Sequence, residues 1–132
     1  MPTLREEEII AFARQWDPQP FHVDPVAAKE SIYGGLIASG WHTALLAMRA
    51  LVENVLSHVD AQGSPGVENL RFRKPVRAGD RLSARYTVLM AEPARRPTLG
   101  KLLGRTELID EAGDVVYQMD GWSLLGRRPS AP

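Results

Sequence analysis

Two side chains that can exchange protons lie five residues apart near the start of the chain. Asp17 is a carboxylate, and His22 carries the one side chain whose ordinary pKa lies close to neutral pH. Pro18 and Pro20 lie between them, fix their own φ angles and bias the preceding residues toward extended backbone. We therefore expect a stiff loop that is not regular helix. An acid and a base held on such a loop can activate a water molecule.

A potential anion site follows at the start of a long apolar segment. The sequence Ala38-Ser39-Gly40 leads into a pattern that predicts a helix over residues 39–59. The first N–H groups of a helix have no partner within it, and the helix dipole favours negative charge there. Gly40 leaves its own N–H open to approach because it has no side chain. Ser39 is interpreted as the N-cap rather than a nucleophile, because no G-x-S-x-G motif surrounds it.

Each of these residues also has an ordinary structural explanation. Asp17 fits a turn residue beside a proline, and Gly40 fits a position of close helix packing. His22 fits a histidine packed beneath a neighbouring aromatic ring. A metal site built from His22, Asp24 and His42 is disfavoured, because their spacing fits no helix face. The combination on one short stretch favours a functional site over separate structural roles.

Three helices are expected in the first half of the chain. A capping box from Thr3 to Glu6 predicts a first helix that ends before Pro18. A second, short helix is predicted from the N-cap Asp24 to the turn at residues 34–35. The third, over residues 39–59, is apolar enough to predict a central core helix. Trp41 is interpreted as a core residue or as part of the wall of a pocket.

After Gly66 the apolar pattern changes to a period of two residues, which indicates strands. Four strand segments are expected, with short hairpin links at residues 78–80 and 111–114 and a longer link at 92–97. Short links predict an antiparallel meander. One long helix and one antiparallel sheet give an α+β fold in which the sheet wraps around the central helix. We expect one domain over residues 1–125 and a disordered tail over residues 126–132.

Composition limits the class of protein. The chain has 132 residues with 16 basic and 16 acidic side chains, so its formal net charge is zero, which argues against a nucleic-acid binder. Cysteine is absent, so thiolate chemistry and disulfides are excluded. The charged N-terminus resembles no signal peptide, and no apolar run reaches the length of a membrane span. We expect a soluble, cytoplasmic protein without membrane association.

Three motifs resemble one known family over most of the chain, from about Thr3 to Leu125. The motifs are D-P-Q-P-F-H-V-D-P-x-x-A, then Y-G-G-L-I-A-S-G-W, then E-N-L-R-F-R-K-P-V-R-A-G-D-R-L. They resemble the MaoC-like dehydratases, which are (R)-specific enoyl-CoA hydratases of the hotdog fold. The first motif is specific, whereas the third is shared more widely among hotdog proteins.

The resemblance implies roles for individual residues. Residues matching Asp17 and His22 hold and activate water in that family, and the backbone N–H matching Gly40 binds the thioester carbonyl. Two positions depart from the family pattern, because Gln19 stands where Asn is usual and Ser39 where His is usual. The oxyanion site should survive both changes, while the acyl pocket is expected to differ. Gln19, Ser39 and Trp41 are expected to join Gly40 in this oxyanion and substrate-binding site. The family also usually has an edge strand before the first helix, so the resemblance implies a chain short by about one strand at its start.

The prediction is a hydro-lyase that adds water reversibly to a 2-enoyl-CoA thioester. The resemblance implies a homodimer or higher homo-oligomer, and the reaction needs no metal and no cofactor beyond the coenzyme A of the substrate. A hotdog acyl-CoA thioesterase and a non-catalytic acyl-CoA-binding domain remain alternatives. Basic residues of one strand and a neighbouring link are read as a solvated face, or as contacts to the phosphates of coenzyme A. They are Arg71, Arg73, Lys74, Arg77, Arg95, Arg96 and Lys101.

Overall fold

The first helix begins later than the sequence pattern predicts. The computed structural model describes residue 1 and residues 3–128, and α1 spans Glu6–Trp16. The predicted capping box from Thr3 to Glu6 is wrong, because the backbone N–H of Arg5 donates to the Glu8 carboxylate at 3.2 Å instead. The helix still ends before Pro18, as expected. Ile9 and Ala13 are fully buried on its inner side.

Two short helices follow α1 and complete a small helical lobe. The expectation that the segment from Asp17 to His22 contains no helix is wrong, because α2 forms one turn over Pro20–Val23. Pro20 occupies the first helical position, where its missing N–H removes no helix bond. The predicted cap of α3, Pro25–Lys29, is confirmed, since the Asp24 carboxylate accepts the N–H groups of Val26 and Ala27 at 3.0 and 3.2 Å.

The long helix α4 spans Gly40–Asn54 and is followed by a short 3-10 helix, η1, over Leu56–His58. It is shorter than predicted, and only one of its faces belongs to the core. Small residues on that face pack toward the sheet: Thr43, Ala47 and Ala50. The opposite face is apolar but exposed, with Trp41 57% and Leu45 56% exposed. The prediction that Trp41 is a core residue is therefore wrong.

Four antiparallel strands form one sheet in the order β1-β4-β3-β2. The strands are β1 Val67–Phe72, β2 Ser83–Pro93, β3 Leu99–Ile109 and β4 Val115–Gly126. Strands β2, β3 and β4 form the predicted meander, and a tight turn at residues 110–114 joins β3 to β4. The predicted position of β1 is wrong, because it pairs with β4 and lies at the opposite edge from β2. Residues 78–80 therefore belong to a crossover link and not to a hairpin.

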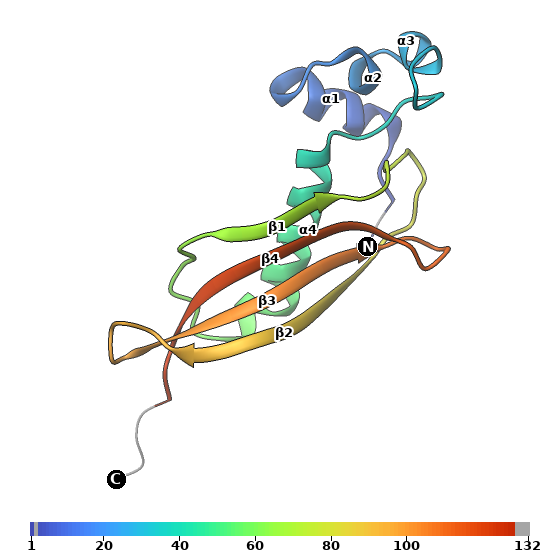
Figure 1. The fold of residues 1–132 in the computed structure, drawn as a ribbon. Helices are drawn as coiled ribbons and strands as arrows, with labels where there is room; N and C mark the ends of the chain where they lie inside the picture. Colours follow the sequence, from blue (N-terminus) through green and yellow to red (C-terminus); the bar gives the residue numbers. More distant parts are fainter. Residues whose placement is uncertain (2, 129–132) are drawn as a thin grey trace.

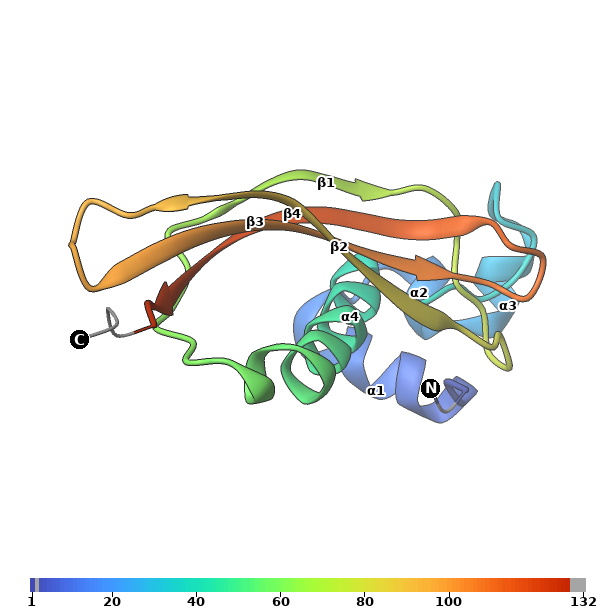
Figure 2. The same cartoon turned by 90° about the horizontal axis from the view of Figure 1, so that it is seen from below.

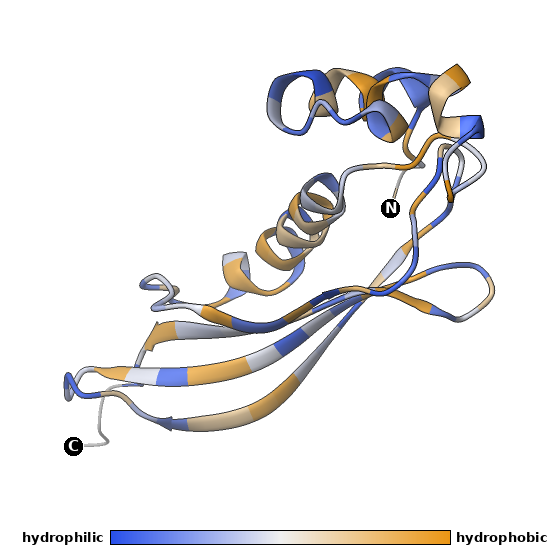
Figure 3. Cartoon of the chain, turned by 45° about the horizontal axis from the view of Figure 1, so that its top comes forward, coloured by the Kyte–Doolittle hydropathy of each residue, from blue (hydrophilic) through white to orange (hydrophobic). Residues whose placement is uncertain are grey.

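The curved sheet covers one side of α4, while the helical lobe lies at the N-terminal end of that helix (Figures 1 and 2). Apolar and polar residues alternate along the strands (Figure 3). The inner apolar residues, among them Leu108, Tyr117 and Val116, form the core with Ile9 and Ala47. Strand β4 includes Gly126, where the predicted tail begins, and residues 129–132 lie outside the described part.

Two backbone hydrogen bonds fix the start of α4 against its surroundings. The N–H of Ile37 donates to the carbonyl of Phe21 in the lobe at 3.1 Å. The N–H of Ala38 donates to the carbonyl of Val76, in the link after β1, at 2.8 Å. The residues just before Gly40 are thus held from both sides, so the lobe and the start of α4 have a defined relative position.

Candidate active site

Asp17 and His22 face each other across the junction of α1 and α2. Oδ2 of Asp17 lies 3.3 Å from Nε2 of His22, and the imidazole is only 5% exposed. Asp17 follows the last residue of α1, where its N–H donates to the carbonyl of Ala13 at 2.8 Å. The helical turn of α2 brings His22 back toward it. The structure therefore places the two predicted acid–base residues side by side.

The second ring nitrogen of His22 defines which atom is available for chemistry. Nδ1 lies 2.8 Å from the backbone carbonyl of Ile37, which can only accept a hydrogen bond. Nδ1 therefore carries the proton, and in the neutral ring the lone pair belongs to Nε2, beside the Asp17 carboxylate. Two acceptors at 3.3 Å repel each other unless a proton or a water molecule is shared between them. The pair is thus arranged to receive a water hydrogen.

Hydrogen bonds from two neighbours orient the Asp17 carboxylate. The Ser39 hydroxyl donates to Oδ2 at 2.7 Å, and the Gln19 side-chain amide donates to Oδ1 at 2.7 Å. Partial burial, the largest single influence, pushes the pKa of Asp17 upward. The hydrogen bonds from Gln19 and Ser39 and the nearby His22 ring together outweigh burial, so the pKa of Asp17 lies below its usual value. The group is a carboxylate near neutral pH.

Ser39 connects this carboxylate to the start of α4. Its hydroxyl oxygen also accepts the N–H of Trp41 at 3.3 Å, so the predicted N-cap role is confirmed. Gly40 is the next residue and the first of α4. Within the described residues no group accepts its N–H. This donor at the positive end of the helix suits an oxygen that gains negative charge.

The face of the Phe72 ring lies against Gly40. A Cβ added to Gly40 would come within 2.9 Å of three ring atoms. Trp41 meets the same ring edge-on, with 5.6 Å between centroids, and otherwise lies on the exposed face of α4. The close-packing explanation of Gly40 therefore has a physical basis beside the functional one. Whether Trp41 lines an acyl pocket stays a prediction.

Most of the basic residues on and after β1 are bound within the chain. Arg73 donates to the Gln118 side chain at 2.9 and 3.1 Å, and Lys74 pairs with two carboxylates of the β3–β4 turn at 2.6 and 3.1 Å. Arg77 donates to the Tyr33 carbonyl at 2.6 Å. These bonds support the reading of that face as structural and solvated.

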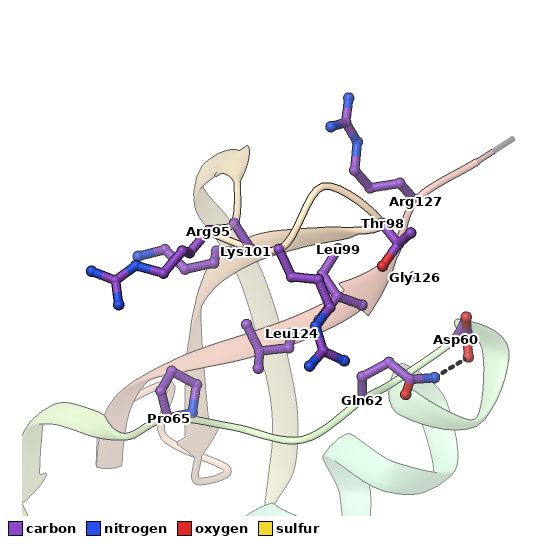
Figure 4. A pocket seen from close by; sticks show the side chains of 12 residues that line it. Asp60, Gln62, Pro65, Arg95, Thr98, Leu99, Lys101, Leu124, Gly126 and Arg127 are labelled. Atoms are coloured by element: carbon purple, nitrogen blue, oxygen red, sulfur yellow. Dashed lines mark hydrogen bonds between the residues drawn. The ribbon is translucent and has the colours of Figure 1, made fainter. Parts of the chain in front are cut away.

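Three of the other predicted basic residues line an open groove at the far end of the sheet (Figure 4). Arg95, Arg96, Lys101 and Arg127 contribute to it, and its volume is about 1060 Å³. The groove lies at the Leu99 end of β3, whereas Phe72 and Gly40 lie near the Leu108 end. At about 3.3 Å per residue these ends are about 30 Å apart. The groove and the Asp17–His22 pair are therefore separate features of one chain.

The described residues lack the features of two other functional classes. They contain no group of three or more His, Asp or Glu side chains that could hold a metal ion. Among them, no helix combines the length and apolar character that crossing a membrane requires. The sequence did not indicate the Ile37 carbonyl or the Ser39–Asp17 bond, since these contacts join residues 15 and 22 positions apart.

Comparisons with known proteins define the family. Residues 2–102 match the MaoC like domain family. Among curated proteins, the uncharacterized protein YdeM of Bacillus subtilis is 31% identical over 92 residues, which cover 70% of this chain and 65% of that protein. Protein MaoC of Klebsiella aerogenes is 37% identical over 86 residues, 64% of this chain and 25% of that protein. The match thus spans less than two thirds of either relative.

A solved structure is similar over nearly the whole chain. The MaoC-like dehydratase from Rhodospirillum rubrum is 37% identical, with a TM-score of 0.87, over 98% of this chain and 88% of that one. The fold is accordingly the hotdog fold, as the sequence resemblance implied. The chain belongs to the MaoC-like family of hydratases and dehydratases.

Proposed function

We propose that the protein adds water reversibly to a 2-enoyl-CoA thioester, with Asp17, His22 and Gly40 as the reacting groups. One observation carries the proposal. The water-activating pair, 3.3 Å apart, is tied through the Ser39 hydroxyl to the helix end that presents the unpaired N–H of Gly40. A base and an oxyanion donor on adjoining elements are what addition to an enoyl thioester requires.

The proposed reaction begins with a water molecule held between Asp17 and His22. One water hydrogen points to Nε2 of His22 and the other to Oδ2 of Asp17. As the oxygen attacks Cβ of the substrate, Nε2 takes one proton, and the Asp17 carboxylate stabilises the resulting imidazolium. The imidazolium then returns a proton to Cα. The product carries the hydroxyl group of the water on Cβ and a hydrogen on Cα. Asp17 and His22 return to their starting protonation states.

Gly40 is proposed to stabilise the negative charge that develops on the thioester oxygen. As water attacks Cβ, electron density moves through Cα to that oxygen, which becomes enolate-like. The Gly40 N–H and the dipole of α4 favour this charge. Losing one donor of this kind typically costs about 3–4 kcal/mol of transition-state stabilisation. Gln19 is proposed to orient the carboxylate through Oδ1.

The direct test is loss of enoyl absorbance when the purified protein is mixed with crotonyl-CoA. We expect the wild type to consume the double bond without releasing free thiol. Asp17→Asn should lose turnover and retain thioester binding, measured by calorimetry. Thiol release would favour the thioesterase alternative. Binding of crotonyl-, octenoyl- and mesaconyl-CoA without any reaction would overturn the hydratase and leave an acyl-CoA-binding domain.

We also propose that the protein acts as a homodimer, built on the exposed apolar face of α4. Its residues follow helical spacing: Trp41, Leu45, Met48 and Val52. A continuous apolar stripe of this kind on a helix usually meets another protein surface. Leu45→Glu should place a charge in the interface and shift the molar mass by light scattering toward the monomer. Glu53→Lys also changes the charge of an exposed position on this helix, but it lies further around the helix axis from the stripe and is the control.

A further inference from the structure

A cavity of about 250 Å³ lies between the C-terminal half of α4 and the inner face of the sheet. Its upper wall is made by Met48, Leu51 and Leu56. Its floor includes Gly104 and Gly121, which pair directly across β3 and β4. Because Gly104 has no side chain, the Tyr86 phenol can lie over it, and the Met119 side chain lies beside Gly121. These side chains, rather than the glycines alone, shape the floor of the cavity.

Two hydroxyl groups without partners line this mainly apolar space, which Ser64 and Ser123 also border. The oxygens of Tyr86 and Thr106 are buried, and within the described residues neither has a hydrogen-bond partner. Thr106 is 2% exposed. The two residues pair directly across β2 and β3, so both project to the inner face. A buried hydroxyl without a partner is costly, and a ligand oxygen can remove that cost.

The Tyr86 hydroxyl lies at the floor of the cavity. It lies over Gly104, where a Cβ would collide with it. Only a glycine allows the phenol to lie across the strand in this way. Burial also raises the pKa of Tyr86, so the group stays a neutral donor. The Tyr86 hydroxyl is thus a group that can donate and accept a hydrogen bond at the closed side of the cavity.

A separate, much narrower cavity of about 20 Å³ lies beside this space, nearer the start of α4. Met48, Leu51, Thr106 and Met119 line both cavities. The narrow one adds Ala44, one helical turn from Gly40. The flexible methionines at the junction can adjust to a chain that passes between them. Both cavities therefore follow the sheet side of α4 from its first turns to its end.

We propose that the acyl chain of the substrate carries a neutral oxygen, a hydroxyl or a ketone, near its distal end, and that Tyr86 and Thr106 recognise it. This inference rests on the proposed thioester hydratase. An ionised carboxylate is excluded as the distal group, because no Lys, Arg or His lines the cavity and a buried charge without a partner is strongly unfavourable.

The distance along α4 from Gly40 to the cavity determines how long the acyl chain of the substrate must be. Met48 is eight residues after Gly40, which is about 12 Å along the helix axis at 1.5 Å per residue. A fully extended chain advances about 3.3–3.6 Å for every three bonds. A thioester carbonyl at Gly40 thus places roughly the tenth chain atom beside the cavity. The proposed class is an enoyl thioester of about ten carbons with an oxygen at its far end.

Three trans-2-enoyl-CoA thioesters of ten carbons, ending in methyl, hydroxyl or carboxylate, test the inference. We expect kcat/KM for 10-hydroxy-2-decenoyl-CoA to exceed that for 2-decenoyl-CoA by about tenfold, the effect of one good neutral hydrogen bond. The carboxylate-terminated chain should be the poorest. Tyr86→Phe and Thr106→Val should reduce the ratio of kcat/KM for the hydroxyl-terminated chain to kcat/KM for the methyl-terminated chain. In Tyr86→Phe this ratio should be close to one.

The matched control is Thr87→Val, which makes the same change as Thr106→Val on the opposite, exposed face of the neighbouring strand. It should keep the full preference. Tyr86→Phe should unfold at the wild-type temperature or above it, because it removes a group that bonds to nothing. Preference of the wild type for the methyl-terminated chain, or an unchanged preference in Tyr86→Phe, would overturn the inference.

Binding of saturated chains separates this inference from the proposed reaction. Calorimetry with 10-hydroxydecanoyl-CoA and decanoyl-CoA requires no turnover. If no enoyl thioester is hydrated but the hydroxylated chain binds more tightly in a Tyr86-dependent way, the cavity inference stands and the hydratase falls. If enoyl thioesters are hydrated without regard to the distal oxygen, the hydratase stands and the cavity inference falls.

Discussion

Replacing Ser39 by alanine removes two interactions with one atom. The hydroxyl is fully buried, caps α4 through the Trp41 N–H at 3.3 Å and donates to Asp17 at 2.7 Å. Loss of an N-cap costs typically about 1 kcal/mol. A hydrogen bond to a charged group contributes about 1.5–3 kcal/mol. We therefore expect Ser39→Ala to lower the free energy of unfolding at pH 7 by about 2–4 kcal/mol.

The pH dependence of this loss separates its two parts. The pKa of Asp17 lies below its usual value in the folded protein. Its stabilising contribution is therefore complete above the pKa of the unfolded chain, about 3.9, and is lost as the pH falls through the lower folded pKa. Below that range the carboxyl group is protonated in both states. The cost of Ser39→Ala should then fall toward the contribution of the cap alone, about 1 kcal/mol.

Urea unfolding at pH 7 and at successively lower pH measures both quantities. At a slope of about 2 kcal/mol per molar urea, the midpoint should fall by about 1–2 M at pH 7. Ser31→Ala is the matched control. Its hydroxyl donates to the Ala28 carbonyl at 2.6 Å and accepts the Tyr33 N–H, with no charged partner. An equal cost of Ser39→Ala at both ends of the pH range would refute the assigned link to Asp17.

Three further outcomes follow from contacts elsewhere in the fold. Asp120→Ala should lower the free energy of unfolding by about 1.5–3 kcal/mol in urea, because it removes the charge-assisted hydrogen bonds from Arg105 at 2.8 and 3.0 Å; a cost near that of a surface substitution would contradict the assignment. The pKa of Asp120 is lowered, chiefly by the Arg105 hydrogen bond, so its contribution should vanish as the pH falls below about 3.9; an Asp120→Asn variant should show a flatter acid limb of thermal stability than the wild type. Gly40→Ala should cost about 1–3 kcal/mol through collision with Phe72, and Phe72→Ala in the same chain should relieve part of that cost; simple additivity of the two changes in thermal unfolding would rule out the collision.

Short-range features of the fold were predictable from the sequence. The cap at Asp24 and the end of α1 before Pro18 depend on residues within a few positions of each other. The turn at residues 110–114 is equally local, since Asp110 accepts the N–H groups of Ala112 and Asp114 within it. Where the local signal was ambiguous it misplaced the detail, as with the capping bond at Arg5 instead of Thr3.

Long-range pairing was not predictable in the same way. A period of two residues identifies β1 as a strand but contains nothing about its neighbour in the sheet. The sequence order suggested β2, whereas β1 pairs with β4 across the sheet. The apolar pattern of α4 likewise does not distinguish a face buried in the same chain from one that is exposed. Both errors arise because burial and pairing depend on the whole fold.

The candidate site shows the same difference between local features, which were predicted, and long-range contacts, which were not. The spacing of Asp17 and His22 and the glycine at the helix start predicted the candidate groups from the sequence, and the structure brings the first two within 3.3 Å. The hydrogen bonds that orient them were not indicated. Ser39 was expected as a cap, as a departure from the family pattern and as a residue of the oxyanion and substrate site, but not as a donor to Asp17.

The geometry of the site depends on elements that are not stable alone. Helices α2 and α3 have four and five residues, and isolated helices shorter than about 12 residues are marginal in water. Their order must come from contacts outside themselves, and the Ile37 region supplies two. Its N–H donates to the Phe21 carbonyl and its own carbonyl accepts from His22. A change that loosens this junction should therefore misplace His22 before it unfolds the sheet, so activity should be lost at lower urea concentrations than strand structure.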